Sequence, residues 1–142
     1  MTTVRMLLER KGRAIFSVEP QASVLDAIRL MAEHHVGALV VMRASALEGI
    51  VSERDYARKV ILRGRSSAET PVRDIMSSPV LTVSLETSVE QCMQLMTDRH
   101  VRHLPVVDGG RVVGLVSIGD LVKAVIAEQR EQIEQLESYI HR

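Results

Sequence analysis

Two short stretches of the chain contain a serine and an aspartate three residues apart. A glycine and two aliphatic residues come directly before the serine. They are Gly49-Ile50-Val51-Ser52-Glu53-Arg54-Asp55 and Gly114-Leu115-Val116-Ser117-Ile118-Gly119-Asp120. Each predicts a buried strand that passes into a helix. Serine followed by an acidic residue at this spacing is typical of a capping box, which needs no ligand. The same groups could also bind one, because a helix N-terminus favours an anion and a carboxylate can accept both hydroxyls of a ribose.

The two stretches belong to a longer internal repeat. A shift of 65 residues aligns His35-Val36 with His100-Val101, Gly49 with Gly114 and Asp55 with Asp120, without a gap. One copy spans about residues 14–62 and the other about residues 79–127. A single register held over this length predicts that the two halves share one fold.

Hydrophobic periodicity predicts the order strand, helix, strand, strand, helix in each copy. A short helix over Thr3–Arg10 precedes them. In the first copy the expected elements are strand Ile15–Val18, a helix capped by Ser23 and ending near His34, strands Ala38–Met42 and Leu47–Ser52, and a helix from Glu53 that stops before Gly64. In the second copy they are strand Val80–Val83, helix Ser88–Arg99, strands Leu104–Val107 and Val112–Val116, and a helix from Ile118.

The composition is that of a soluble globular protein. Of 142 residues, 46% are hydrophobic and 25% charged, with a formal net charge of zero. The neutral balance and the presence of only one phenylalanine and two tyrosines argue against a nucleic-acid surface. The single cysteine, Cys92, cannot form an internal disulfide, and its place on the inward face of a helix predicts a core residue. Without a signal-like N-terminus or a membrane-spanning apolar run, we expect a cytoplasmic protein.

The duplicated element order, the Gly-hydrophobic-hydrophobic-Ser-x-x-Asp motif that closes each copy, and His-Val-x-x-Leu before each middle strand resemble a tandem pair of CBS domains, a Bateman module. The chain is most similar to the stand-alone bacterial proteins of this kind. The resemblance implies an α+β fold with pseudo-twofold symmetry and small sheets packed on helices. The corresponding domains are residues 1–64 with the lead-in helix, a linker at 65–71, residues 72–127, and a helical extension at 128–142.

The resemblance also implies a function. Such modules bind adenosine-containing ligands in the cleft between the two halves, so AMP, ATP or NAD(H) is expected here. They transmit a conformational change to a regulated partner protein, whose identity this sequence does not give, and they usually assemble as disc-like homodimers. No catalytic constellation supports an enzyme, and no catalytic cofactor is expected. The alternative is a scaffold that only dimerises, in which the serine–aspartate pairs serve as caps.

Residue by residue, Asp55 and Asp120 match the family position that holds the ribose hydroxyls, and Ser52 and Ser117 match the position that contacts phosphate or ribose. Arg54 matches Gly119 in the second copy, so we expect the site of Ser52 and Asp55 to bind phosphate better, with help from Lys59. Residues matching the adenine slot are Ile15, Phe16, Val18, Val36, Gly37 and Ala38 in the first copy, and Val80, Val83, Val101, Arg102 and His103 in the second. Arg102 and His103 stand where the first copy has Gly37 and Ala38, and could lend positive charge to the cleft.

The histidines and the last helix show two further patterns. His34, His35, His100 and His103 do not have the spacing of a metal site, and no metal is expected. The last helix carries an apolar stripe at three-and-four spacing, which we expect to pack on a partner subunit. The alternative is a frayed charged tail after Glu128. The stripe consists of Val122, Val125, Ile126, Gln129, Ile133, Leu136 and Ile140.

Overall fold

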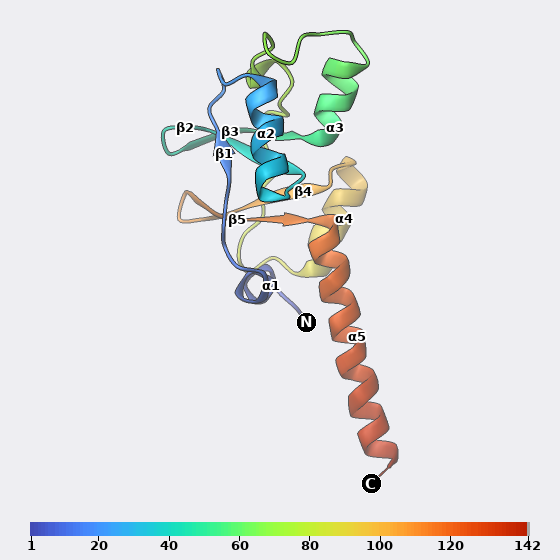
Figure 1. The fold of residues 1–142 in the computed structure, drawn as a ribbon. Helices are drawn as coiled ribbons and strands as arrows, with labels where there is room; N and C mark the ends of the chain where they lie inside the picture. Colours follow the sequence, from blue (N-terminus) through green and yellow to red (C-terminus); the bar gives the residue numbers. More distant parts are fainter. Residues whose placement is uncertain (142) are drawn as a thin grey trace. The chain divides into compact units, whose positions relative to one another are not determined.

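The computed structural model describes residues 1–141 and contains two compact units, each with the sheet of one repeat (Figure 1). The first-repeat unit is Ala14–Leu81, and the second-repeat unit combines Met1–Arg13 with the chain from Thr82 onward. The N-terminal helix α1 (Val4–Lys11), which the sequence places before the first repeat, is therefore part of the second-repeat unit.

The first-repeat unit is built around a three-stranded sheet. Strands β1 (Ser17–Val18) and β2 (Ala38–Arg43) are parallel, and β3 (Ala46–Ser52) is antiparallel to β2. The helical segments are α2 (Val24–His34), α3 (Glu53–Tyr56), the π-helical turn η1 (Ala57–Ile61) and the 3₁₀ turn η2 (Val72–Asp74). Its core consists of Val24, Ala27, Met31, Leu39, Val41, Val51, Val60, Val72 and Ile75.

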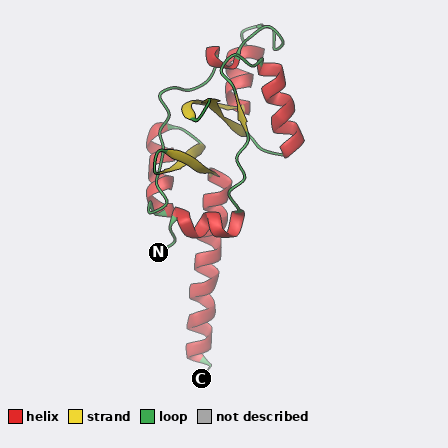
Figure 2. Cartoon of the chain, turned by 90° about the vertical axis from the view of Figure 1, so that its left-hand side faces the viewer, coloured by secondary structure: helices red, strands yellow, loops and turns green. Residues whose placement is uncertain are grey.

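The second-repeat unit has a two-stranded antiparallel hairpin and three helices (Figure 2). The hairpin consists of β4 (His103–Asp108) and β5 (Arg111–Ser117), joined at Gly109 and Gly110, which both adopt positive φ. Besides α1, the helices are α4 (Val89–Arg99) and α5 (Ile118–Ile140). Buried side chains of both strands and of α1, α4 and α5 fill its interior, including Leu8, Cys92, Leu104, Val116 and Leu121.

The predicted strand Val80–Val83 is wrong, and the predicted strand Ile15–Val18 is shorter than expected. In the first repeat the amide of Val40 donates to the carbonyl of Phe16, which joins β1 to β2. Pro105 stands at the position of Val40 in the second repeat and has no N–H to donate. Only an isolated bridge remains, in which Val83 pairs with Val106.

The segment that leads into each repeat packs against the sheet of the other. A Cβ added to Gly114 on β5 would lie 2.7 Å from Cδ1 of Leu8 in α1. A Cβ added to the matching Gly49 on β3 would lie 2.5 Å from Sδ of Met76, just beyond η2. Both distances are too short for a real side chain, so these glycines allow the lead-in segments to approach the strands.

Candidate functional site

The first serine–aspartate junction forms a complete capping box at the start of α3. Ser52 Oγ accepts a hydrogen bond from the Asp55 amide at 3.2 Å, and Asp55 Oδ2 accepts from the Ser52 amide at 2.9 Å. The Ser52 hydroxyl also donates to Asp55 Oδ2 at 3.0 Å. One carboxylate oxygen of Asp55 is therefore directed at its own main chain.

The other oxygen of Asp55 meets a lysine. Lys59 Nζ lies 3.2 Å from Asp55 Oδ1, one turn further along the same helical segment, and also donates to the carbonyl of Ile75 at 2.9 Å. Ile75 follows η2, so Lys59 links the carboxylate to the segment that leads into the second repeat. Lys59 thus forms an ion pair with Asp55, and its help in binding a phosphate stays a prediction.

The second junction forms the same capping box at the start of α5. Ser117 Oγ accepts from the Asp120 amide at 3.1 Å, and Asp120 Oδ2 accepts from the Ser117 amide at 2.8 Å. The same oxygen lies 2.5 Å from Lys11 Nζ, at the C-terminal end of α1. Lys11 also donates to the carbonyl of Leu115 at 2.5 Å.

The surroundings of Asp120 favour its charged form. Burial disfavours ionisation, but the hydrogen bond from Lys11, the Ser117 amide and the lysine charge together outweigh burial and lower the pKa of Asp120 below its ordinary value of 3.8. Both junctions thus show the capping arrangement, and the ribose-binding role of Asp55 and Asp120 stays a prediction.

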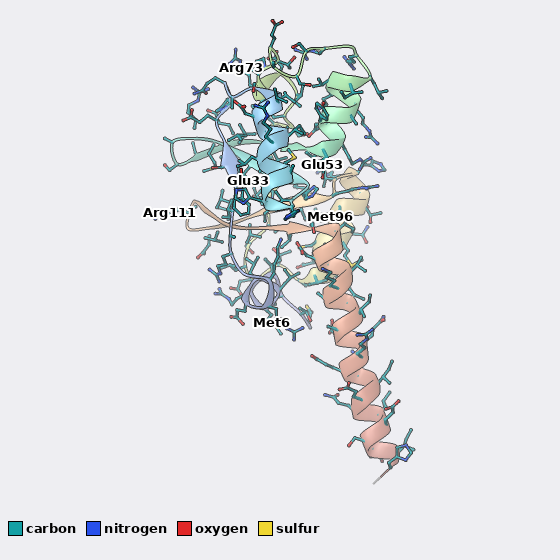
Figure 3. The ribbon with its side chains drawn as sticks, in the orientation of Figure 1. Met6, Glu33, Glu53, Arg73, Met96 and Arg111 are labelled. Atoms are coloured by element: carbon teal, nitrogen blue, oxygen red, sulfur yellow. The ribbon has the colours of Figure 1, made fainter. Side chains whose placement is uncertain are left out.

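The first-repeat unit brings several predicted ligand residues together. Ala38 lies opposite Ser52 in the sheet, and the Gly37 carbonyl accepts a hydrogen bond from the amide of Glu53 at 3.0 Å. Val36 and Gly37 line a pocket of about 280 Å³ beside Glu53. Figure 3 labels Glu53, the first residue of α3. The remaining lining residues come from α2 and its C-terminal end: Ile28, Met31, Ala32 and His35.

Other predicted adenine-slot residues of this unit contribute mainly to packing. Ala38 is only 2% exposed, so its side chain belongs to the core. Phe16 stacks on His34 of α2, with ring centroids 3.8 Å apart, and packs with Val18 against the core cluster. Ile15 and Val80 are half-buried.

In the second-repeat unit, His103 lies opposite Ser117 in the hairpin, as Ala38 lies opposite Ser52. The carbonyl of Arg102 accepts from the amide of Ile118 at 2.9 Å, while its side chain is exposed. Val101 is half-buried, and Val83 is buried. The hairpin thus places Arg102 and His103 beside the serine–aspartate junction of their own repeat.

Sequence reasoning missed Lys11, Glu53 and His35. Glu53 follows a predicted site serine directly, and His35 precedes Val36, so their neighbourhood could have been inferred. Lys11 gave no such signal, because its contact with Asp120 joins residues 109 positions apart. His35 and His100 both adopt φ of 55° where α2 and α4 end. Among residues 1–141, no group of three or more histidine, cysteine or acidic side chains could hold a metal ion, and no helix is long and apolar enough to span a membrane.

Comparison with known proteins gives the family. Residues 12–62 and 72–127 each match the family model of the CBS domain. The chain is 44% identical to the mitochondrial CBS domain-containing protein CBSX3 of Arabidopsis thaliana, over 98% of this chain and 72% of that protein. It is 36% identical to the CBS domain-containing protein YhcV of Bacillus subtilis, over 75% of this chain and 76% of that protein.

A solved structure shows the same fold. The structure of a putative signal-transduction protein with CBS domains from Burkholderia ambifaria is 52% identical and has a TM-score of 0.86, covering 90% of this chain and 96% of that one. The duplicated fold, the two family matches and these relatives agree, and the chain therefore belongs to the CBS-domain family as a tandem pair of CBS domains.

Proposed function

We propose that this chain is a regulatory module that binds an adenosine-containing nucleotide, AMP, ATP or NAD(H), and passes a conformational change to a partner protein. The observation that carries the proposal is the meeting of two predicted groups of residues in the first-repeat unit. The phosphate- and ribose-type residues Ser52 and Asp55 begin α3, and Val36 and Gly37 line a pocket beside Glu53. Its volume of about 280 Å³ lies near the lower end of small-molecule pockets, roughly 300 Å³.

The charges at this junction suit a nucleotide. Asp55 offers Oδ1 to a ribose if Lys59 turns away, and the displaced ammonium is then available to a phosphate. Arg54, in the first turn of α3, adds a second cation, whereas Gly119 adds none in the second repeat. We therefore assign the stronger phosphate affinity to the first repeat. The names of the relatives, CBS-domain and signal-transduction proteins, favour regulation over catalysis.

Calorimetric titration with AMP, ATP and NADH tests this proposal. We expect at least one of them to bind, and a ligand at a hundred times its dissociation constant to stabilise the chain by about 2.7 kcal/mol. Asp55→Asn should weaken binding about tenfold, since it removes the charge that holds the hydroxyls. Asp26→Asn is the matched control, because Asp26 also stands at the third position of a serine-capped helix but outside the predicted site. No heat and no thermal shift with any of the three nucleotides would leave only the scaffold function.

We also propose that the chain is a homodimer held in part by α5. Figures 1 and 2 both show the C-terminal half of α5 extending away from the rest of the second-repeat unit. Ile133, Leu136 and Ile140 are 54%, 63% and 73% exposed there. With Ile126 and Gln129 they form a heptad stripe that has isoleucine at every a position and leucine at one d position, the kind of apolar stripe that packs on a second helix. A second copy of α5 presents the same stripe, and Arg130 and Glu137 on its flank can pair between antiparallel copies.

The mass of the protein in solution tests this pairing. The double variant Ile133→Glu, Leu136→Glu should shift the mass from two chains toward one, because it places charges in the stripe. Ser138→Glu adds a charge on the opposite side of the same helix and should leave the mass unchanged. A double variant with the wild-type mass would show that the copies associate through another surface. The cytoplasmic location stays a prediction, and the Arabidopsis relative is mitochondrial.

A further inference from the structure

The carboxylate of Asp120 is bound by a lysine from outside its own repeat. Lys11 Nζ lies 2.5 Å both from Asp120 Oδ2 and from the carbonyl of Leu115. The side chains are 36% and 20% exposed, so the pair stands at the surface end of a half-buried junction. A ligand hydroxyl that donates to this carboxylate oxygen would therefore compete with Lys11 for it.

The first repeat is arranged differently. Its lysine, Lys59, lies four residues after Asp55 and contacts the other carboxylate oxygen, Oδ1. At the matching position the second repeat has Ala124, which carries no charge. The second repeat therefore takes its cation from α1, and that cation binds the oxygen that also accepts from the Ser117 amide.

The two ends of α1 are held in different ways. At the N-terminal end, main-chain bonds run from Val4 to the carbonyl of Thr87 at 2.8 Å and from Arg5 to the carbonyl of Leu85 at 2.9 Å. At the C-terminal end the polar contacts come from side chains, Lys11 to Asp120 and Arg10 to Glu131 at 3.5 Å. Gly12 follows with φ of 98°, a conformation that lets the chain turn away from the helix. Leu8 is buried, but residues 9–12 beyond it are exposed and can therefore loosen while the rest of α1 stays in place.

We propose that Lys11 is a built-in competitor for the ligand of the second repeat. A ribose hydroxyl that takes up Oδ2 of Asp120 must displace the Lys11 ammonium, so the second site binds the nucleotide more weakly than it would without the lysine. Occupancy of the second site then releases residues 9–12, the turn at the end of α1. Because Arg10 in that turn pairs with Glu131 of α5, the release also loosens one contact on the helix that carries the exposed stripe. This inference rests on the proposed nucleotide-binding function.

The size of the effect follows from the contact. Hydrogen bonds to charged groups are strong when buried, and solvent weakens them at the surface. The Lys11–Asp120 contact lies between these cases. Removing the competitor should therefore tighten ligand binding at the second site about three- to tenfold.

Calorimetric titration of three full-length proteins with AMP and with ATP tests the competition. Lys11→Gln removes the charge but keeps a side chain of similar reach. Arg13→Gln, which removes an exposed positive charge two residues beyond Lys11, is the matched control. We expect Lys11→Gln to tighten the weaker of two sites about three- to tenfold and to leave the stronger one unchanged. Arg13→Gln should leave both affinities unchanged.

Hydrogen exchange of the amides of residues 8–12 supplies a second readout. In the wild type, exchange should rise when nucleotide is added at a concentration that fills both sites. In Lys11→Gln it should already be high and should not rise further. This readout separates competition from a merely structural role, which would change exchange without changing affinity.

The outcomes distinguish the two proposals. If the stronger site binds normally and Lys11→Gln leaves the weaker one unchanged, the competition is wrong and the nucleotide-binding function stands. If Lys11→Gln weakens the second site, Lys11 is a ligand-binding residue, and the competition is again wrong. If neither the wild type nor Lys11→Gln binds AMP, ATP or NADH at any site, the nucleotide-binding function fails and the competition fails with it.

Discussion

The serine–aspartate junctions of the two repeats share one hydrogen-bond pattern and differ in the lysine that completes it. In both, the serine hydroxyl accepts from the aspartate amide and the carboxylate accepts from the serine amide. The first repeat adds Lys59 from its own helical segment, whereas the second adds Lys11 from α1. The cap follows from a local motif and is repeated with it, while the lysine comes from a neighbouring turn in the first repeat and from a distant segment in the second.

A second comparison shows why α1 is in that position. Each sheet has a glycine that admits the lead-in segment of the other repeat, Gly114 for Leu8 and Gly49 for Met76. Each sheet is therefore packed against the lead-in segment of the other repeat, which for the second sheet lies over a hundred residues away in sequence. This packing also places Lys11 at the end of the helix that reaches Asp120.

Truncation of Leu8 and Met76, the side chains that pack against Gly114 and Gly49, should lower stability the most. The loss should differ between the two repeats. Leu8 is 1% exposed, so Leu8→Ala should lower the free energy of unfolding by about 2–5 kcal/mol. Met76 is only partly buried, and Met76→Ala should cost less. Urea unfolding of both variants gives the comparison. Equal losses would contradict the view that α1 is the more deeply packed lead-in.

Replacing Gly49 or Gly114 with alanine should affect the repeats in the opposite order, with the larger loss of stability in the first repeat. The Cβ of Gly49→Ala would lie 3.0 Å from the Ser77 carbonyl as well as near Met76, and Ser77 is held by two main-chain bonds to Ile50. The Cβ of Gly114→Ala would meet only the side chain of Leu8. Overpacking costs about 1–3 kcal/mol, and we expect Gly49→Ala at the upper end of that range and Gly114→Ala at the lower.

A second substitution should recover part of the stability that Gly114→Ala loses, and the same unfolding measurement tests it. Leu8→Val shortens the side chain that Gly114→Ala would meet, so it should recover part of the loss in the double variant. Failure of this rescue would show that the backbone of β5, and not Leu8, limits the space at Gly114.

Local patterns predicted most of the fold. The serine caps of α2, α3, α4 and α5, the hairpin turn after Asp108 and the length of the last helix all follow from residues within a few positions of one another. The missing strand at Val80–Val83 depends on the residue opposite it. The alignment of Pro105 with Val40 was visible in the sequence and could have indicated its loss.

The candidate site was less predictable for a physical reason. Motif spacing located Ser52, Asp55, Ser117 and Asp120, because a capping box is local. The lysine partner of Asp55 is also local, four residues along the chain, but the partner of Asp120 depends on tertiary packing. The packing that brings Lys11 to Asp120 requires Leu8 to fit at Gly114, a match between residues over a hundred positions apart that no local pattern reports.

Removal of the caps should have a smaller effect than changes in the core and should treat the repeats alike. Ser52→Ala and Ser117→Ala each remove a hydroxyl that accepts a hydrogen bond from a main-chain amide in the first turn of the helix. Each should lower the free energy of unfolding by about 1 kcal/mol. Thermal unfolding of both single variants measures this. A much larger loss for one of them would mean that its serine supports more than the cap.

The ion pair between Lys11 and Asp120 should make the stability of the chain depend modestly on pH in the acid range. The pKa of Asp120 is lowered on folding, so its contribution to stability is complete above the ordinary value of 3.8 and is lost as the pH falls through the folded pKa. Lys11→Gln should lower stability by about 0.2–1 kcal/mol at neutral pH, and the difference from the wild type should shrink below about pH 4. Denaturant titrations at several pH values measure it. A difference that does not change with pH would assign the loss to packing of the lysine stem.

The smallest effect is expected where the repeats differ by a single buried atom. Cys92 in α4 matches Ala27 in α2, and both are 0% exposed. Burial raises the pKa of the Cys92 thiol to about 11, so it stays protonated at pH 8 and should not react with a disulfide reagent in the native state. A thiol placed at the matching position by Ala27→Cys, in a Cys92→Ala background, should be equally protected, and Cys92→Ala alone should change stability by about 1 kcal/mol or less. Faster labelling at one position would show that its helix opens more readily, because the thiol becomes accessible only when the helix leaves the sheet.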